Sequence, residues 1–152
     1  EIVTITDLLP QDNEISGWVS TGNTWWATSS SELNQYINGE EPDYTKYGFR
    51  EGAMQSYSGT VLENSAIVEV RVFDQQSEEN AQALFQELAT RLVNPLVWSE
   101  AGEEAKIERF PLSQKIIFWK SKYFVSLTID SGLDEALNVL KTFATNVDAK
   151  IS

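Results

Sequence analysis

The chain has 152 residues, of which 41% are hydrophobic and 11% aromatic, and this predicts one globular domain spanning residues 1–152. Its 11 basic and 23 acidic side chains give a formal net charge of −12, which repels phosphate backbones and excludes nucleic acid as a favoured partner. The absence of Cys and His excludes disulfides, zinc–thiolate sites and histidine-based catalysis, and no apolar run approaches the length that inserts into a membrane.

The apolar opening, Ile2–Pro10, predicts a short strand or a single helical turn. Residues 11–31 are rich in Asn, Ser, Thr and Gly and carry Trp18, Trp25 and Trp26, which is typical of a loop pinned to the core by large side chains. Only a brief strand near 18–21 is expected there. Because the only methionine is Met54, we expect a processed or trimmed piece that has lost either a signal peptide or a longer N-terminal part.

A helix is predicted to begin near Ser30. The run Ser29-Ser30-Ser31-Glu32 has the spacing of a capping box, in which a hydroxyl and a carboxylate satisfy free backbone amides at the helix start. Pro42 lacks an amide hydrogen and its ring crowds the preceding turn, so we expect a kink or a second helical turn near this residue.

Two further patterns follow. Val68, Val70 and Val72 alternate with charged residues, as in a half-buried strand, and 53–57 is the expected hairpin partner. Ser77 is then positioned to cap a helix whose apolar residues fall at helical spacing and which ends before Asn94-Pro95.

The C-terminal half predicts weak strands at 96–99 and 106–110 and a central hairpin of 115–119 with 123–129. An amphipathic helix follows a cap at Ser131. The element order α-β-β-α-β-β-β-α predicts an α+β fold. We expect an antiparallel sheet of about five to six strands with three helices mainly on one face, and a possible α-β-β duplication.

Acidic pairs such as Glu40-Glu41, Glu78-Glu79 and Glu103-Glu104 are able to supply calcium ligands or a catalytic carboxylate pair. Carboxylates in first helical turns and loops are more often solvated groups that favour the helix dipole. We therefore assign no catalytic residue, metal or cofactor.

Adjacent tryptophans in a strand point to opposite sides, so one of Trp25 and Trp26 is expected in the core and the other at the surface. An exposed tryptophan in a polar setting is able to stack on a sugar ring or to anchor a protein partner. Together with Tyr36, Asn38, Tyr44 and Tyr47, this pair makes up the predicted ligand or partner surface.

Four short motifs stand at fixed spacing in the first third of the chain: Leu8-Leu9-Pro10, Gly17-Trp18, Tyr36-Ile37-Asn38-Gly39 and Tyr44-Thr45-Lys46-Tyr47-Gly48-Phe49. This pattern resembles an uncharacterised family of exported bacterial domains, a domain of unknown function. The resemblance implies an α+β fold and an exported, periplasmic or cell-surface location, and it implies no activity. The chain departs from the family at Glu40-Glu41-Pro42. A purely structural reading of the motif is a helix face that ends at Gly48.

The favoured hypothesis is a non-enzymatic binding or interaction module at the bacterial cell envelope, with an unknown protein or glycan as partner. The alternative is a carboxylate-based hydrolase that acts on a glycan or peptide. A structural or assembly role is the third reading, and the sequence does not determine the oligomeric state.

Overall fold

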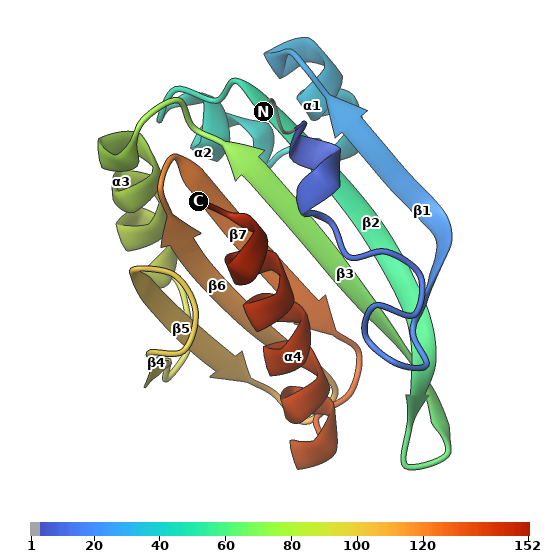
Figure 1. The fold of residues 1–152 in the computed structure, drawn as a ribbon. Coiled ribbons are helices and arrows are strands. Elements are labelled where there is room, and N and C mark those ends of the chain that lie inside the picture. The colour runs from blue at the N-terminus through green and yellow to red at the C-terminus, as the bar shows by residue number, and fades with distance from the viewer. Residues whose placement is uncertain (1–3) are drawn as a thin grey trace.

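The computed structural model describes residues 4–152, in which seven strands form one antiparallel sheet with the spatial order β1-β2-β3-β7-β6-β5-β4 (Figure 1). The strands span Val19–Ala27 (β1), Glu51–Val61 (β2), Asn64–Asp74 (β3), Leu96–Trp98 (β4), Glu104–Arg109 (β5), Gln114–Lys120 (β6) and Tyr123–Ile129 (β7). The helices span Ile5–Leu8 (η1, a 3-10 turn), Ser30–Tyr36 (α1), Glu41–Thr45 (α2), Glu78–Ala89 (α3) and Asp134–Lys150 (α4). None of these helices combines the length and the apolar character that a bilayer crossing requires.

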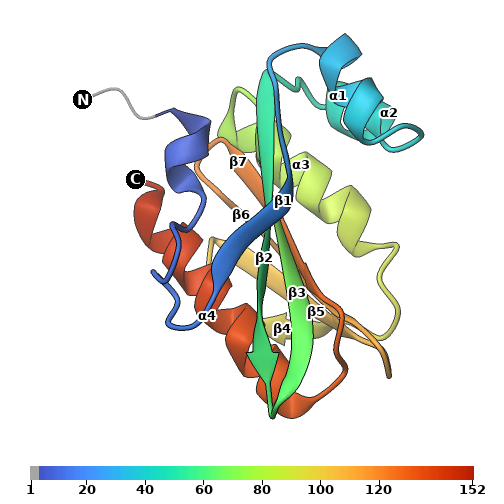
Figure 2. The same cartoon turned by 90° about the vertical axis from the view of Figure 1, so that its right-hand side faces the viewer.

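Helices cover both faces of the sheet, which corrects the expectation that they gather on one face. Seen along the sheet edge, η1 and α4 lie on one side, here called the α4 face, and α1, α2 and α3 lie on the other, the α3 face (Figure 2). Each face has its own apolar layer. The central strands are accordingly apolar on both sides: Phe118 of β6 faces α4, whereas its neighbour Ile117 faces α3.

The sheet has seven strands, where five to six were predicted, and β1 runs much further than the brief segment expected near residues 18–21. Its sequence lacks apolar alternation, and most of its side chains are exposed. It is held by pairing with β2, and the register shifts between Thr21 and Thr24, the signature of a β-bulge.

Three local predictions are confirmed. Ser29 and Ser77 accept hydrogen bonds from helix amides at the starts of α1 and α3, and a second short helix, α2, begins beside Pro42. The valines of β3 lie in the apolar layer of the α4 face. Four consecutive strands separate α3 from α4, where three were expected, and the α-β-β duplication stays a prediction.

The N-terminal segment packs on the α4 face through Ile5 and Leu8, and Lys150 adds polar contacts to it. Of the predicted opening element, the part from Thr4 onward contains the turn η1, and Ile2 and Val3 lie outside the described residues. Lys150 at the end of α4 donates to Glu14 (2.7 Å) and to the Leu9 carbonyl (3.3 Å), and the Gln11 amide also donates to Glu14 (2.9 Å). These contacts fix the loop that follows η1.

We expect Gly59→Ala to lower the free energy of unfolding by about 1–3 kcal/mol, because a Cβ atom there meets Trp18 at 2.5 Å and displaces a buried ring. Gly22→Ala is the matched control: a Cβ atom there meets nothing within 4 Å, and we expect a change below about 0.5 kcal/mol. Urea unfolding of both variants measures the difference, and equal effects would contradict the packing argument.

The contacts between Lys150 and Glu14 predict a pH-dependent stability. Partial burial opposes ionisation of Glu14, but hydrogen bonds from Lys150 and the Gln11 amide outweigh it and lower the pKa of this carboxyl from 4.5 to about 2. A carboxyl whose pKa is lower in the folded chain than in the unfolded chain stabilises the fold at any pH above its unfolded-state pKa. For Glu14 this contribution disappears as the pH falls from about 4.5 toward about 2.

Glu14→Gln should therefore lower the free energy of unfolding by about 1 kcal/mol near neutral pH, and by less as the solution is acidified. Urea unfolding at a series of pH values tests this. Glu100→Gln is the control, because Glu100 is exposed in the connection between β4 and β5. A difference between Glu14→Gln and the parent chain that stays constant down to about pH 3 would be inconsistent with this mechanism.

Candidate functional site

Helix α2 is too short to be stable alone, and the sheet holds it in place. The ring of Tyr44 stacks on Phe73 of β3 with 4.0 Å between ring centroids and 18° between planes. The buried side chain of Gln75 donates to the carbonyls of Tyr44 (2.9 Å) and Tyr47 (3.0 Å). These contacts seat the helix on the α3 face and satisfy its last carbonyls.

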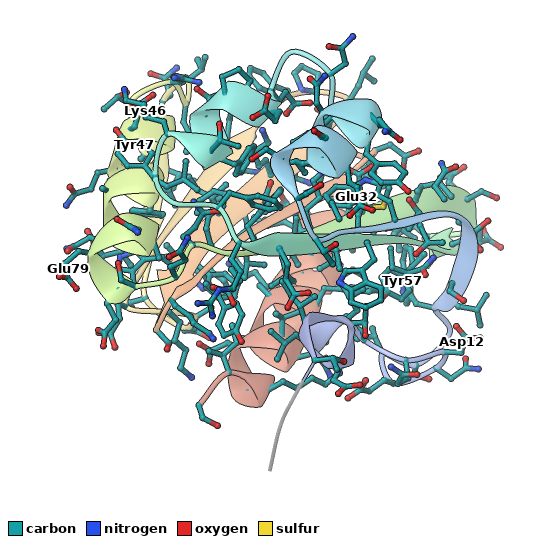
Figure 3. All side chains as sticks on the ribbon, turned by 90° about the horizontal axis from the view of Figure 1, so that it is seen from above. Asp12, Glu32, Lys46, Tyr47, Tyr57 and Glu79 are labelled. Atoms are coloured by element: carbon teal, nitrogen blue, oxygen red, sulfur yellow. The ribbon has the colours of Figure 1, made fainter. Side chains whose placement is uncertain are left out.

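Ionic contacts then join α2 to α3. Arg91 binds both carboxylate oxygens of Asp43, at 2.8 and 3.0 Å, and also contacts Glu87 at 2.6 Å. Glu87 accepts further hydrogen bonds from the Tyr47 hydroxyl and from Lys46, and these two donors lower the pKa of the Glu87 carboxyl. Figure 3 shows Lys46 and Tyr47 beside α3. The two helices therefore form one connected wall.

A cavity of about 240 Å³, here called the α2–α3 pocket, lies between this wall and the sheet. Its apolar lining consists of Leu88, Leu92, Ile117 and Phe124. Its polar lining consists of Glu40, Asp43, Tyr44, Arg91, Glu108, Lys115 and Ser126. An apolar floor with a few polar groups is the usual make-up of a small-ligand site.

Several of the polar groups in the pocket have no partner within residues 4–152. The hydroxyl of Tyr44 makes no hydrogen bond, although the residue is only 5% exposed, and the same holds for the ammonium of Lys115 and the hydroxyl of Ser126. Glu108 is 8% exposed, and one of its oxygens accepts from the Val93 amide at 2.7 Å. The Tyr44 hydroxyl and the polar groups of Lys115 and Ser126 are partly open to solvent, so they are accessible to a ligand that enters the pocket.

Charge in the pocket is set by the same geometry. Burial raises the pKa of the Tyr44 hydroxyl, which is therefore a neutral hydrogen-bond donor at physiological pH. Arg71, just outside the lining, is already bound to Glu69 at 2.9 Å and to Glu40 at 3.4 Å. Lys115 lies directly opposite Glu108 in the register of β5 and β6, but no ion pair joins them within residues 4–152, so its ammonium is open to an anionic group.

The predicted surface residues do not form one surface and lie at four places in the fold. Tyr44 and Tyr47 lie on and beside α2 at the pocket wall, whereas Trp25 is buried and stacks on the half-exposed ring of Tyr36 (5.4 Å between centroids). Trp26 lies on the α4 face, because its cross-strand partner Ala53 belongs to that apolar layer. The expectation that one tryptophan enters the core and the other reaches the surface is confirmed. Asn38 is exposed in the turn between α1 and α2.

Sequence reasoning missed Glu108, Lys115 and Ser126. Lys120 and Lys122, at the turn of the same hairpin, pair with Asp148 and Asp74, whereas Lys115 lines the pocket. Glu108, Lys115 and Ser126 are far from Tyr44 along the chain, so no local sequence pattern indicates that they share a site with it. Only the neighbouring positions of β5, β6 and β7 bring them together.

The carboxylates with shifted pKa values give no proton donor. Backbone and side-chain hydrogen bonds lower the pKa of Asp12 and Glu32, and Glu14 and Glu87 are lowered as described above. A hydrolase that uses paired carboxylates needs one with a raised pKa. Within residues 4–152 no three acidic side chains gather in a metal-binding arrangement.

The fold is similar to that of the extracellular domain of PknH from Mycobacterium tuberculosis, with a TM-score of 0.62 over 96% of this chain and 93% of that chain. Only 13% of the residues are identical, so the likeness concerns the fold alone. No protein-family model matches the chain, and no curated protein matches it. The resemblance to an uncharacterised exported family stays a prediction.

Replacing Tyr44 by Phe keeps the stack on Phe73 and removes a hydroxyl that has no partner. We expect the free energy of unfolding to stay within about 0.5 kcal/mol of the parent value. Tyr44→Ala removes the ring and should cost about 3–5 kcal/mol. Chemical denaturation distinguishes the two, and a large loss in Tyr44→Phe would show that the hydroxyl serves the fold.

Proposed function

We propose that this chain is a non-enzymatic binding module at the bacterial cell envelope and that the α2–α3 pocket holds a small zwitterionic ligand, such as an amino acid or the end of a peptide. The observation that carries the proposal is the convergence of unpartnered polar groups on one cavity with an apolar floor. An apolar cavity with a few convergent polar groups is the usual form of a small-ligand site.

The chemistry of the lining supports the choice of ligand. The ammonium of Lys115 is a point charge suited to a carboxylate, and the free oxygen of Glu108 is an acceptor suited to an ammonium group. Tyr44 and Ser126 add hydroxyls that orient the ligand, and the apolar floor accommodates a side chain.

Two further observations support the location. The chain shares its fold with a domain that is extracellular in another protein. The motifs of the first third resemble those of exported bacterial domains. Both agree with a location outside the cell.

The test is isothermal titration calorimetry of the chain with a panel of free amino acids and dipeptides. We expect at least one of these probes to bind, and we expect Lys115→Ala to weaken it by about tenfold or more, because a charge-assisted contact is lost. Tyr44→Phe should weaken binding without loss of stability.

Lys106→Ala is the matched control, since this lysine lies on the neighbouring strand β5 outside the pocket lining. It should leave the affinity unchanged. If no probe in the panel binds, or if Lys115→Ala and Tyr44→Phe bind as tightly as the parent chain, the proposal is wrong.

A further inference from the structure

A second cavity lies on the opposite face of the sheet from the α2–α3 pocket. Its volume is about 510 Å³, within the range of small-ligand sites, and it lies between the N-terminal loop and strands β1 and β2. We call it the β1 trough. Its polar lining consists of Thr6, Gln11, Asp12, Ser20, Thr24 and Gln55.

The side chains of the trough are held in defined positions. The amide of Gln55 donates to the carbonyls of Thr21 (2.8 Å) and Asn23 (3.2 Å), which flank the bulge in β1. Since the amide nitrogen of Gln55 is occupied, its oxygen is left as an acceptor without a partner in residues 4–152. The trough is thus fixed before any ligand arrives.

Asp12 supplies a second acceptor. One of its oxygens accepts from the Ser20 amide at 2.7 Å, and this hydrogen bond lowers the pKa of the Asp12 carboxyl. The group is therefore ionised at neutral pH and has an oxygen to spare. Figure 3 shows Asp12 on the N-terminal loop, at the far side of the molecule from Lys46 and Tyr47.

The exposed ring of Trp26 lies further along β1, next to the residues that line the trough. Ser20, Thr24 and Trp26 all face the α4 side, because their cross-strand partners Tyr57, Gln55 and Ala53 alternate along one face of β2. Trp26 is 53% exposed, and its indole nitrogen donates to Glu51 at 2.8 Å. That hydrogen bond holds the ring in place and leaves its apolar face to solvent.

We infer that the β1 trough and Trp26 together form a binding site for a neutral saccharide. A sugar ring presents C–H groups that pack on an aromatic face and hydroxyls that donate to carboxylate and amide oxygens. Trp26 supplies the face, and Asp12 and Gln55 supply the acceptors. No basic side chain lines the trough within residues 4–152, so an anionic ligand has no counter-charge there.

Tryptophan fluorescence gives a direct test, because the other tryptophans are each less than one-tenth exposed and acrylamide therefore quenches mainly Trp26. The probes are short neutral oligosaccharides of glucose, N-acetylglucosamine, galactose or mannose. We expect at least one of them to protect the fluorescence from acrylamide. Unchanged quenching with every sugar, or protection by dipeptides alone, overturns the inference.

Calorimetry with the protecting sugar assigns the residues. Trp26→Ala should weaken binding by about tenfold, and Asp12→Asn, which keeps an acceptor for the Ser20 amide, should weaken it as well. Tyr36→Ala is the matched control, since Tyr36 is 50% exposed but lies on the α3 face. Unchanged affinity in Trp26→Ala, or an equal loss in Tyr36→Ala, contradicts the assignment.

The two sites are tested independently. Lys115→Ala and Tyr44→Phe remove groups of the α3 face and should leave saccharide binding as it is in the parent chain. A saccharide that binds when no amino acid or dipeptide does would support the trough and reject the pocket. Saccharide binding that is lost in Lys115→Ala would place the sugar on the wrong face and overturn the inference.

Discussion

Phe73 is the side chain on which the α3 face depends. It is fully buried on β3 and has aromatic contacts with Tyr44, Trp25, Phe49 and Phe124. Helices α1 and α2 are too short to be stable without tertiary contacts. Packing on the aromatic cluster supplies the stability that a longer helix gains from its internal hydrogen bonds. It also aligns Tyr44 so that the hydroxyl lies in the pocket lining while the ring stays in the core.

The sheet separates two cavities of different chemistry. On the α3 face, a cation, a buried carboxylate and hydroxyls line an apolar floor, which suits a small ligand with charges of both signs. On the α4 face, acceptor oxygens and an exposed tryptophan lie along β1, which suits a ligand rich in hydroxyls. Because the central strands are tightly packed on both sides, the two cavities are not continuous. Residues of one cavity can therefore be replaced without changing the other.

Charge pairing positions several elements of the fold and leaves Lys115 open to the pocket. In a chain with net charge −12, most basic side chains have acidic neighbours, and Arg71, Arg91 and Lys150 each bind a carboxylate that fastens one element to another. These pairs are partly exposed and add little stability one by one, but they set positions. Lys115 lies directly opposite Glu108 in the register of β5 and β6 but forms no ion pair within residues 4–152, so its ammonium stays open to the α2–α3 pocket.

The sequence by itself determined the features that depend on local periodicity and capping: the valine strand β3, the Ser77-capped helix α3, the hairpin β6–β7, the helix α4 and the opposite orientations of Trp25 and Trp26. Only the tertiary structure decided that β1 is a long edge strand. Its polar sequence has no strand periodicity, and it is extended because it pairs with β2. The tertiary structure also decided that helices cover both faces and that Tyr44 meets Glu108 and Lys115. Periodicity shows which side of an element is apolar, but strand order and the side on which a helix crosses the sheet arise from packing between distant segments.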